Sequence, residues 1–156
     1  MGRIVFDDEP ENAPEAVYSG VNYVDKVSCK EVIRYNEGAG KKKVVLVDCG
    51  VKTNIIRCLL RRDVEVIRVP WDYDFNHLEF DGLFISNGPG DPDTCDAAVQ
   101  NIRRAMQNPK LPIFGICMGN QLLSKAGGAK IYKLKYGHRS HNQPVRMAGT
   151  EQIGRA

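Results

Sequence analysis

The sequence lacks any apolar run that approaches the roughly 20 residues of a membrane-spanning helix. Its first ten residues, MGRIVFDDEP, lack the apolar stretch of a secretory signal peptide. The five cysteines are an odd set without a CxxC pair, so neither a disulfide framework nor a zinc site fits. Internal repeats and low-complexity tracts are also absent. We therefore expect a soluble, cytoplasmic protein without a membrane partner or a bound metal.

Charge of one sign is not in large excess either. The chain of 156 residues has 22 Lys and Arg against 19 Asp and Glu, and 42% of it is hydrophobic, as in one ordinary globular domain. The balance is uneven, with −4 over residues 1–40 and +7 over the rest. Because Lys and Arg are not grouped with stacking aromatic residues, we expect no nucleic-acid partner.

Residues 1–40 and 41–152 differ in their hydrophobic pattern. The first segment has no sustained period, is broken by Pro10 and Pro14, and ends in the linker-like stretch Asn36–Gly40. We predict that it is an N-terminal arm, either extended or the tail of a preceding domain. The second segment is predicted to be a separate domain.

In residues 41–152, short apolar runs alternate with segments of helical periodicity. The runs predict strands and the periodic segments predict helices, so the pattern indicates βαβ units. We expect a Rossmann-like (flavodoxin-like) α/β fold with a mostly parallel sheet and helices on both faces. The predicted strands are 44–47, 64–69, 82–86 and 111–116, and the predicted helices are 55–60, 97–106 and 120–126.

A β-hairpin is predicted near the C-terminus. Residues Lys130–Lys135 alternate charged and apolar side chains, Tyr136-Gly137 is a turn signal, and Gln143–Val145 follows. Such a pattern is typical of two strands with one face in water.

The stretch Gly115–Gly119, GICMG, is the candidate nucleophile elbow, and it lies between a predicted strand and a predicted helix. In the related G-x-S-x-G elbow the nucleophile occupies a strained turn, with small neighbours because the backbone passes close by. Cys117 would then project at the carboxyl edge of the sheet, where the helix N-terminus favours a thiolate. The alternative is that Cys117 is a small buried apolar residue, as free cysteines often are.

The glycine loop, Asn87–Pro92, follows the neighbouring strand. Gly88 and Gly90 let the backbone approach a ligand and turn N–H groups toward a developing oxyanion. The alternative is a plain strand-to-helix turn capped by Asp91 or Asp93. Gln121 lies one helical turn beyond the elbow, where it either faces the same site or is exposed to solvent.

Together these motifs resemble the class I (triad type) glutamine amidotransferases and, more narrowly, the small chain of carbamoyl phosphate synthetase. The resemblance covers about residues 24–150 and is carried by VVLVDCGVKTNIIRCLLRR, SNGPGDP, GICMGNQLL and GAKIYKLKYGHRSHNQPV. It implies that the cysteine attacks the side-chain amide of glutamine, giving a glutamyl thioester and ammonia. The implied residues are Cys117 as nucleophile, Gly88 and Gly90 at the glutamine and oxyanion, Met118 through its backbone, and Gln121 through its side chain.

The resemblance also implies a partner. The large synthetase chain would combine the ammonia with bicarbonate and ATP to make carbamoyl phosphate for arginine and pyrimidine synthesis. ATP and Mg²⁺ would bind to that chain, so we expect no cofactor in this one.

The sequence departs from the family pattern in two places. Asn120 stands where the family usually has His, in a position that is not the catalytic base. The family's His-x-Glu pair, which supplies that base well after the elbow, is not found up to Ala156. His77-Leu78-Glu79 does spell His-x-Glu, but it precedes the cysteine and matches no family position. His138 and His141 are expected to be solvated or to face a partner. We therefore expect a truncated, inactive amidotransferase domain, with a cloning remnant over residues 153–156.

Two other functions fit the pattern. One is another cysteine or serine hydrolase with a nucleophile elbow. The other is a non-catalytic docking module whose basic hairpin binds the large chain.

Overall fold

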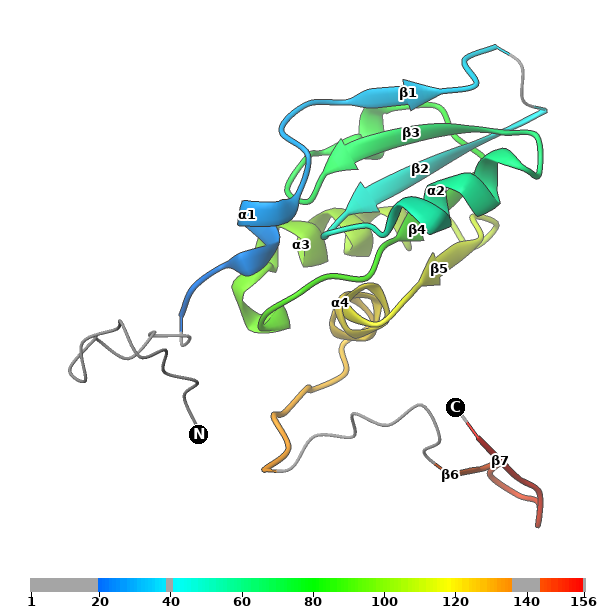
Figure 1. Ribbon diagram of the computed structural model, residues 1–156. Coiled ribbons are helices and arrows are strands. Elements are labelled where there is room, and N and C mark those ends of the chain that lie inside the picture. The colour runs from blue at the N-terminus through cyan, green and yellow to red at the C-terminus, as the bar shows by residue number, and fades with distance from the viewer. Residues whose placement is uncertain (1–19, 39–40, 136–143, 156) are drawn as a thin grey trace, which may run out of the picture.

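A five-stranded sheet forms the centre of the computed structural model, which describes residues 20–38, 41–135 and 144–155 (Figure 1). The strand order is β1-β3-β2-β4-β5; β1 is antiparallel to β3, and all other neighbours are parallel. The predicted α/β fold with a mostly parallel sheet is thus confirmed. The strands are β1 (Ile33–Tyr35), β2 (Lys42–Asp48), β3 (Val64–Pro70), β4 (Gly82–Ile85) and β5 (Ile113–Gly115).

Helices cover both faces of the sheet because successive residues of its buried strands point to opposite sides. On one side, Leu46 and Val66 pack against Ile56 of α2 (Thr53–Leu60). On the other side, Val45 and Val47 belong to a larger apolar core. Helices α3 (Asp96–Ala105) and α4 (Met118–Ala126) contribute to that core. Two short 3₁₀ turns complete this part of the chain, η1 (Phe75–His77) and η2 (Pro92–Thr94).

Part of the predicted N-terminal arm belongs to the sheet layer. Residues 20–38 include α1 (Tyr23–Val27) and β1, which pairs with β3. The side chain of Val24 is fully buried in the large core. The described part of the arm is therefore not an extended segment apart from the sheet. The division into an arm and a domain at residue 40 stays a prediction.

A C-terminal hairpin is present, but its strands differ from those predicted. Strand β6 (Pro144–Arg146) pairs antiparallel with β7 (Ile153–Arg155), whereas Lys130–Lys135 forms no strand. That prediction was wrong because alternation produces a strand only where the apolar side chains find a surface to cover. Here Tyr132 is 79% exposed and Leu134 is 42% exposed. The predicted turn at Tyr136-Gly137 lies outside the described residues.

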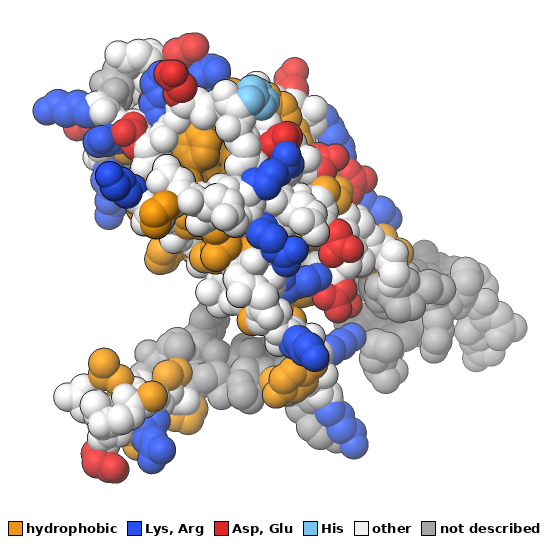
Figure 2. All heavy atoms as spheres, turned by 180° about the vertical axis from the view of Figure 1, so that it is seen from behind, with side chains coloured by type: hydrophobic (Ala, Val, Ile, Leu, Met, Phe, Trp, Pro, Cys, Tyr) orange, Lys and Arg blue, Asp and Glu red, His pale blue; other side chains and the backbone are white. Residues whose placement is uncertain are grey.

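Apolar and charged side chains are interspersed on the face shown in Figure 2, including on the hairpin. Val145, Met147 and Ile153 of the hairpin segment are all at least half exposed. Among the helices in the described ranges, none has the length and apolar character needed to cross a membrane.

Candidate functional site

Three turns meet at one edge of the sheet, because the carboxyl ends of parallel strands lie at the same edge. The segment Cys49–Lys52 joins β2 to α2, the glycine loop follows β4, and the elbow joins β5 to α4. This edge is where open α/β sheets place their ligands.

Cys117 occupies the strained position of the elbow. It is the N-cap of α4 with φ 52° and ψ −108°, a left-handed backbone conformation that residues other than glycine rarely adopt. Its side chain is exposed, whereas Cys49 and Cys95 are buried and Cys29 and Cys58 are partly buried. The alternative in which Cys117 is a buried apolar residue is therefore excluded.

The two glycines of the elbow are required by close backbone contacts. A Cβ atom on Gly119 would lie 2.2 Å from the carbonyl oxygen of Ile85, at the end of β4. A Cβ atom on Gly115 would lie 2.5 Å from the carbonyl carbon of Gly119. Because real Cβ atoms do not approach so closely, α4 can begin directly on the end of β4 only with glycine at both positions.

The elbow is bonded to the start of the glycine loop. The Gly119 N–H donates to the carbonyl oxygen of Ser86 at 3.0 Å, and the Ile116 N–H donates to that of Ile85 at 3.0 Å. These two bonds fix the thiol-bearing turn against the strand from which the glycine loop emerges.

The glycine loop is packed against the turn after β2. A Cβ atom on Gly88 would lie 2.1 Å from the carbonyl oxygen of Cys49, so no other residue fits there. Gly90 has φ +89° and lies against Tyr23 of α1. Asp91 caps η2, since its carboxylate accepts from the Asp93 N–H at 2.9 Å. The loop is thus a turn capped by Asp91, with its glycines against the backbone after β2 and against α1. Whether its N–H groups face a ligand stays a prediction.

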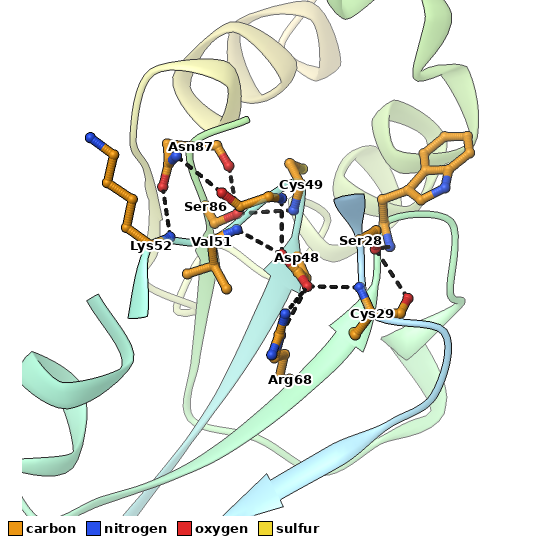
Figure 3. Close-up of polar contacts among 11 residues, drawn as sticks. Ser28, Cys29, Asp48, Cys49, Val51, Lys52, Arg68, Ser86 and Asn87 are labelled. Carbon is orange, nitrogen blue, oxygen red and sulfur yellow. Dashed lines mark hydrogen bonds and ion pairs between the residues drawn. The ribbon is translucent and has the colours of Figure 1, made fainter. Parts of the chain in front are cut away.

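A polar network below the loop is formed by side chains from the ends of β2 and β4 (Figure 3). The Ser86 hydroxyl accepts from the Cys49 N–H at 2.9 Å and donates to the Asn87 carbonyl oxygen at 2.8 Å. The Asn87 amide donates to the Gly50 carbonyl oxygen at 3.1 Å and accepts from the Lys52 N–H at 3.3 Å. The glycine loop is therefore attached to the β2–α2 turn by two side chains.

Asp48 is the buried anion of this network. One carboxylate oxygen accepts from the N–H groups of Gly50 and Val51, at 2.9 and 2.8 Å. The other accepts from the Cys29 N–H at 2.8 Å and from the guanidinium of Arg68 at 2.9 Å. Burial alone raises the pKa of Asp48, but the backbone N–H groups and Arg68 outweigh it and hold the pKa below its usual value. Partial burial of Cys29 and the neighbouring charge of Asp48 raise the pKa of the Cys29 thiol to about 11.

Lys125 ties the last turn of α4 to the end of the glycine loop. Its Nζ atom lies 2.7 Å from a carboxylate oxygen of Asp93 and 3.6 Å from one of Asp96. It also donates to the carbonyl oxygen of Pro92 at 3.3 Å. Burial lowers the pKa of Lys125, but these partners outweigh it and the pKa lies above its usual value. Both ends of α4 are thus attached to the segment that follows β4.

The remaining predicted residues are placed differently. Met118 is buried in the core, so only its backbone is available at the edge of the sheet. Gln121 and Asn120 are exposed on the first turns of α4. His77 is exposed on η1, where Nε2 lies 3.3 Å from the Tyr73 hydroxyl, and η1 contacts α3 rather than the elbow. His138 and His141 lie outside the described residues.

Sequence reasoning placed Asn87 in the glycine loop without a role for its side chain, and it assigned no site role to Ser86 or Asp48. The available signal was their position: each is polar and directly ends or follows a buried apolar strand. Within the described ranges, no group of His, Cys, Asp and Glu is arranged to hold a metal ion.

Comparisons with known proteins extend these observations. A sequence model of the family described as glutamine amidotransferase class-I matches residues 45–155. The multifunctional protein CAD of Squalus acanthias is 48% identical over 97% of this chain, which corresponds to 7% of its own length. The arginine-specific carbamoyl phosphate synthase small chain of Saccharomyces cerevisiae is 45% identical over 97% of this chain and 38% of its own. The carbamoyl phosphate synthase small chain of Pyrococcus furiosus is 46% identical over 87% of this chain and 38% of its own. The chain therefore spans well under half the length of these relatives.

A solved structure is also similar. It is a Thermoplasma acidophilum protein provisionally described as part of a GMP synthase, with a TM-score of 0.53 and 30% sequence identity. The similarity covers 61% of this chain and 49% of the other.

Proposed function

Because the chain belongs to the class I glutamine amidotransferases, we propose that Cys117 is the nucleophile that releases ammonia from the side-chain amide of glutamine. The observation that carries this proposal is the exposed thiol at a strained N-cap of α4, beside the glycine loop. A strained turn that exposes a thiol at a helix N-terminus is a recurrent arrangement for nucleophilic catalysis.

In the first half of the proposed reaction, the Cys117 sulfur attacks the amide carbon and forms a carbon–sulfur bond. The carbonyl oxygen becomes an oxyanion, which we propose is held by backbone N–H groups of Met118 and the glycine loop. The intermediate collapses with cleavage of the carbon–nitrogen bond, and the nitrogen leaves as ammonia after it takes up a proton. This leaves a glutamyl thioester on Cys117.

In the second half, water attacks the thioester carbon and glutamate leaves as the sulfur regains its proton. Glutamine and water thus become glutamate and ammonia. Gln121 and the glycine loop, with Gly88 and Gly90, are proposed to bind the substrate, and no cofactor is proposed for this chain.

Both proton transfers need a base, since a cysteine nucleophile is activated by an adjacent proton acceptor. The sequence after Cys117 contains no His-x-Glu pair up to residue 156, and His77 lies on η1 against α3. We therefore propose that these 156 residues alone hydrolyse glutamine slowly, even though the nucleophile half of the site is formed.

The relatives suggest the destination of the ammonia. Two of them are named as small chains of carbamoyl phosphate synthase. We propose that this chain has the same role and delivers ammonia to a large synthetase chain, on which ATP and Mg²⁺ bind. The arginine-specific relative and the multifunctional relatives fit a place in arginine or pyrimidine synthesis.

A labelling experiment tests the proposed nucleophile without requiring turnover. A glutamine analogue with an α-chloroketone in place of its side-chain amide should alkylate Cys117 faster than the other four cysteines, and glutamine should protect it. Cys117→Ala abolishes this labelling, whereas Cys58→Ala leaves it unchanged because Cys58 lies on α2. Equal labelling of Cys58 and Cys117, without protection by glutamine, would contradict the proposal.

Ammonia release from a glutamine series tests the proposed need for an external base. The chain alone should release ammonia at no more than a small multiple of the Cys117→Ala background. Robust turnover that depends on Cys117 would show that a base is present within these 156 residues.

A further inference from the structure

Ser86 is bonded to all three turns at the carboxyl edge of the sheet. Its N–H donates to the Val47 carbonyl oxygen at 3.1 Å, and its own carbonyl oxygen accepts from the Gly119 N–H of the elbow at 3.0 Å. Its hydroxyl accepts from the Cys49 N–H of the β2–α2 turn and donates to the Asn87 carbonyl oxygen. The side chain is fully buried, so water cannot replace these bonds.

The hydrogen bond from the Ser86 hydroxyl to the Asn87 carbonyl oxygen also fixes the direction of the Gly88 N–H. In a trans peptide the C=O and the following N–H point in opposite directions, and the structure contains no cis peptide bond in the described residues. When the Ser86 hydroxyl holds the Asn87 oxygen, it therefore turns the Gly88 N–H away from the buried interior. Gly88 belongs to the proposed substrate-binding loop.

We propose that Ser86 is a positioning residue, whose hydroxyl orients the Gly88 N–H of the glycine loop while its carbonyl anchors the elbow that carries Cys117. The inference rests on the proposed function, in which the Cys117 thiol is the nucleophile and the Gly88 N–H is a donor to the substrate. One residue thus sets the relative position of both halves of the site.

Ser86→Ala tests the role because it removes the hydroxyl and keeps the backbone carbonyl that bonds to Gly119. Ser28→Ala is a matched control. The Ser28 hydroxyl also accepts a backbone N–H, from Trp71 at 3.0 Å, and donates to the next carbonyl oxygen, that of Cys29 at 3.3 Å. It too is buried, and it has no bond to the glycine loop. Both variants lose equivalent hydrogen bonds.

The measurement is the ratio of two alkylation rates at Cys117 in the 156-residue chain, for the glutamine chloroketone and for iodoacetamide. Iodoacetamide reports access to the thiol, and the chloroketone reports the glutamine site as well. Ser86→Ala should lower the ratio about tenfold, and Ser28→Ala should leave it within about twofold of the wild type. A Ser86→Ala ratio within twofold of the wild type would overturn the inference.

A second variant and a second readout keep the two proposals separate. If Ser86→Ala does not fold, Ser86→Cys decides, because a thiol of similar size weakens both bonds and should lower the ratio by a smaller factor.

If the wild type shows no selective chloroketone labelling, the proposed function fails, and amide hydrogen exchange then decides the positioning role. Faster exchange at Cys49 and altered exchange at Gly88 in Ser86→Ala, but not in Ser28→Ala, support it, while Gly119 keeps its bond to the Ser86 carbonyl; unchanged exchange at Gly88 overturns it.

Discussion

Individual glycines determine how closely helix α4, which has Cys117 as its N-cap, approaches the sheet. Gly119 lies on the end of β4, where a Cβ atom would collide with the backbone of Ile85. Gly127, at the other end of α4, has its nearest atoms at 3.5 Å or more from a built Cβ and a φ of −73°. A side chain therefore fits at Gly127 but not at Gly119.

Gly119→Ala should destabilise the protein by about 3 kcal/mol, since backbone atoms must move to admit the methyl group. Gly127→Ala should change the free energy of unfolding by less than about 1 kcal/mol, in either direction. Urea unfolding at pH 7 measures both. Equal effects of the two substitutions would show that the contact with Ile85 does not limit residue 119.

The elbow residues were identifiable from the sequence because strain leaves a local signature. A tight strand-to-helix turn with a residue at positive φ needs small neighbours, and Gly115 and Gly119 are close to Cys117 in the chain. The role of Ser86 is different, because its partners Cys49 and Gly119 are far away in sequence. Such bonds depend on strand order, which a single sequence does not specify.

At the level of elements, apolar periodicity predicted the long segments to within a few residues. Strand β2 and helix α2 have a continuous apolar run and a clear helical face. Helix α1 has five residues and β1 has three, which is too short for either to show a period. They form because tertiary contacts stabilise them: β1 pairs with β3, and Val24 enters the core.

Paired substitutions on α1 test whether it contributes to the fold. Val24 is fully buried and Val27 is 47% exposed on the same short helix. Val24→Ala should destabilise the protein by about 2 kcal/mol through lost burial and a cavity, and Val27→Ala by less than about 1 kcal/mol. Thermal or urea unfolding measures the difference. If Val24→Ala is as mild as Val27→Ala, α1 is not part of the cooperative unit.

At the scale of the whole molecule, the buried carboxylate of Asp48 joins segments that are distant in sequence. Asp48 bonds to the segment before β1, to Arg68 of β3 and to the turn before α2. Its pKa is lower in the folded state than the value of about 3.9 in the unfolded state. The stabilisation is therefore present above about pH 4 and is lost as the pH falls through the folded-state pKa.

Asp48→Asn should destabilise the protein by about 3 kcal/mol at pH 7, because it leaves Arg68 without its anion and places an amide donor against N–H donors. The difference from the wild type should shrink as the pH falls below about 4, because the unfolded chain then binds a proton at Asp48 while the folded chain, with its lower pKa, does not yet do so. Asp72→Asn, at an exposed side chain, is the control and should cost less than about 0.5 kcal/mol. Urea unfolding at a series of pH values gives both curves. A constant difference down to low pH would mean that the charge of Asp48 has no part in stability.

The backbone conformation at the N-cap of α4 also has a thermodynamic consequence. A φ of 52° with ψ −108° costs about 1 kcal/mol or more at any residue with a Cβ atom. Cys117→Gly should therefore unfold at a higher denaturant concentration than Cys117→Ala, although neither variant retains a thiol. A domain of this size has a total stability of only about 5–15 kcal/mol. Because residue 117 is cysteine and not glycine, this strain lowers the free energy of unfolding by a measurable fraction of that total.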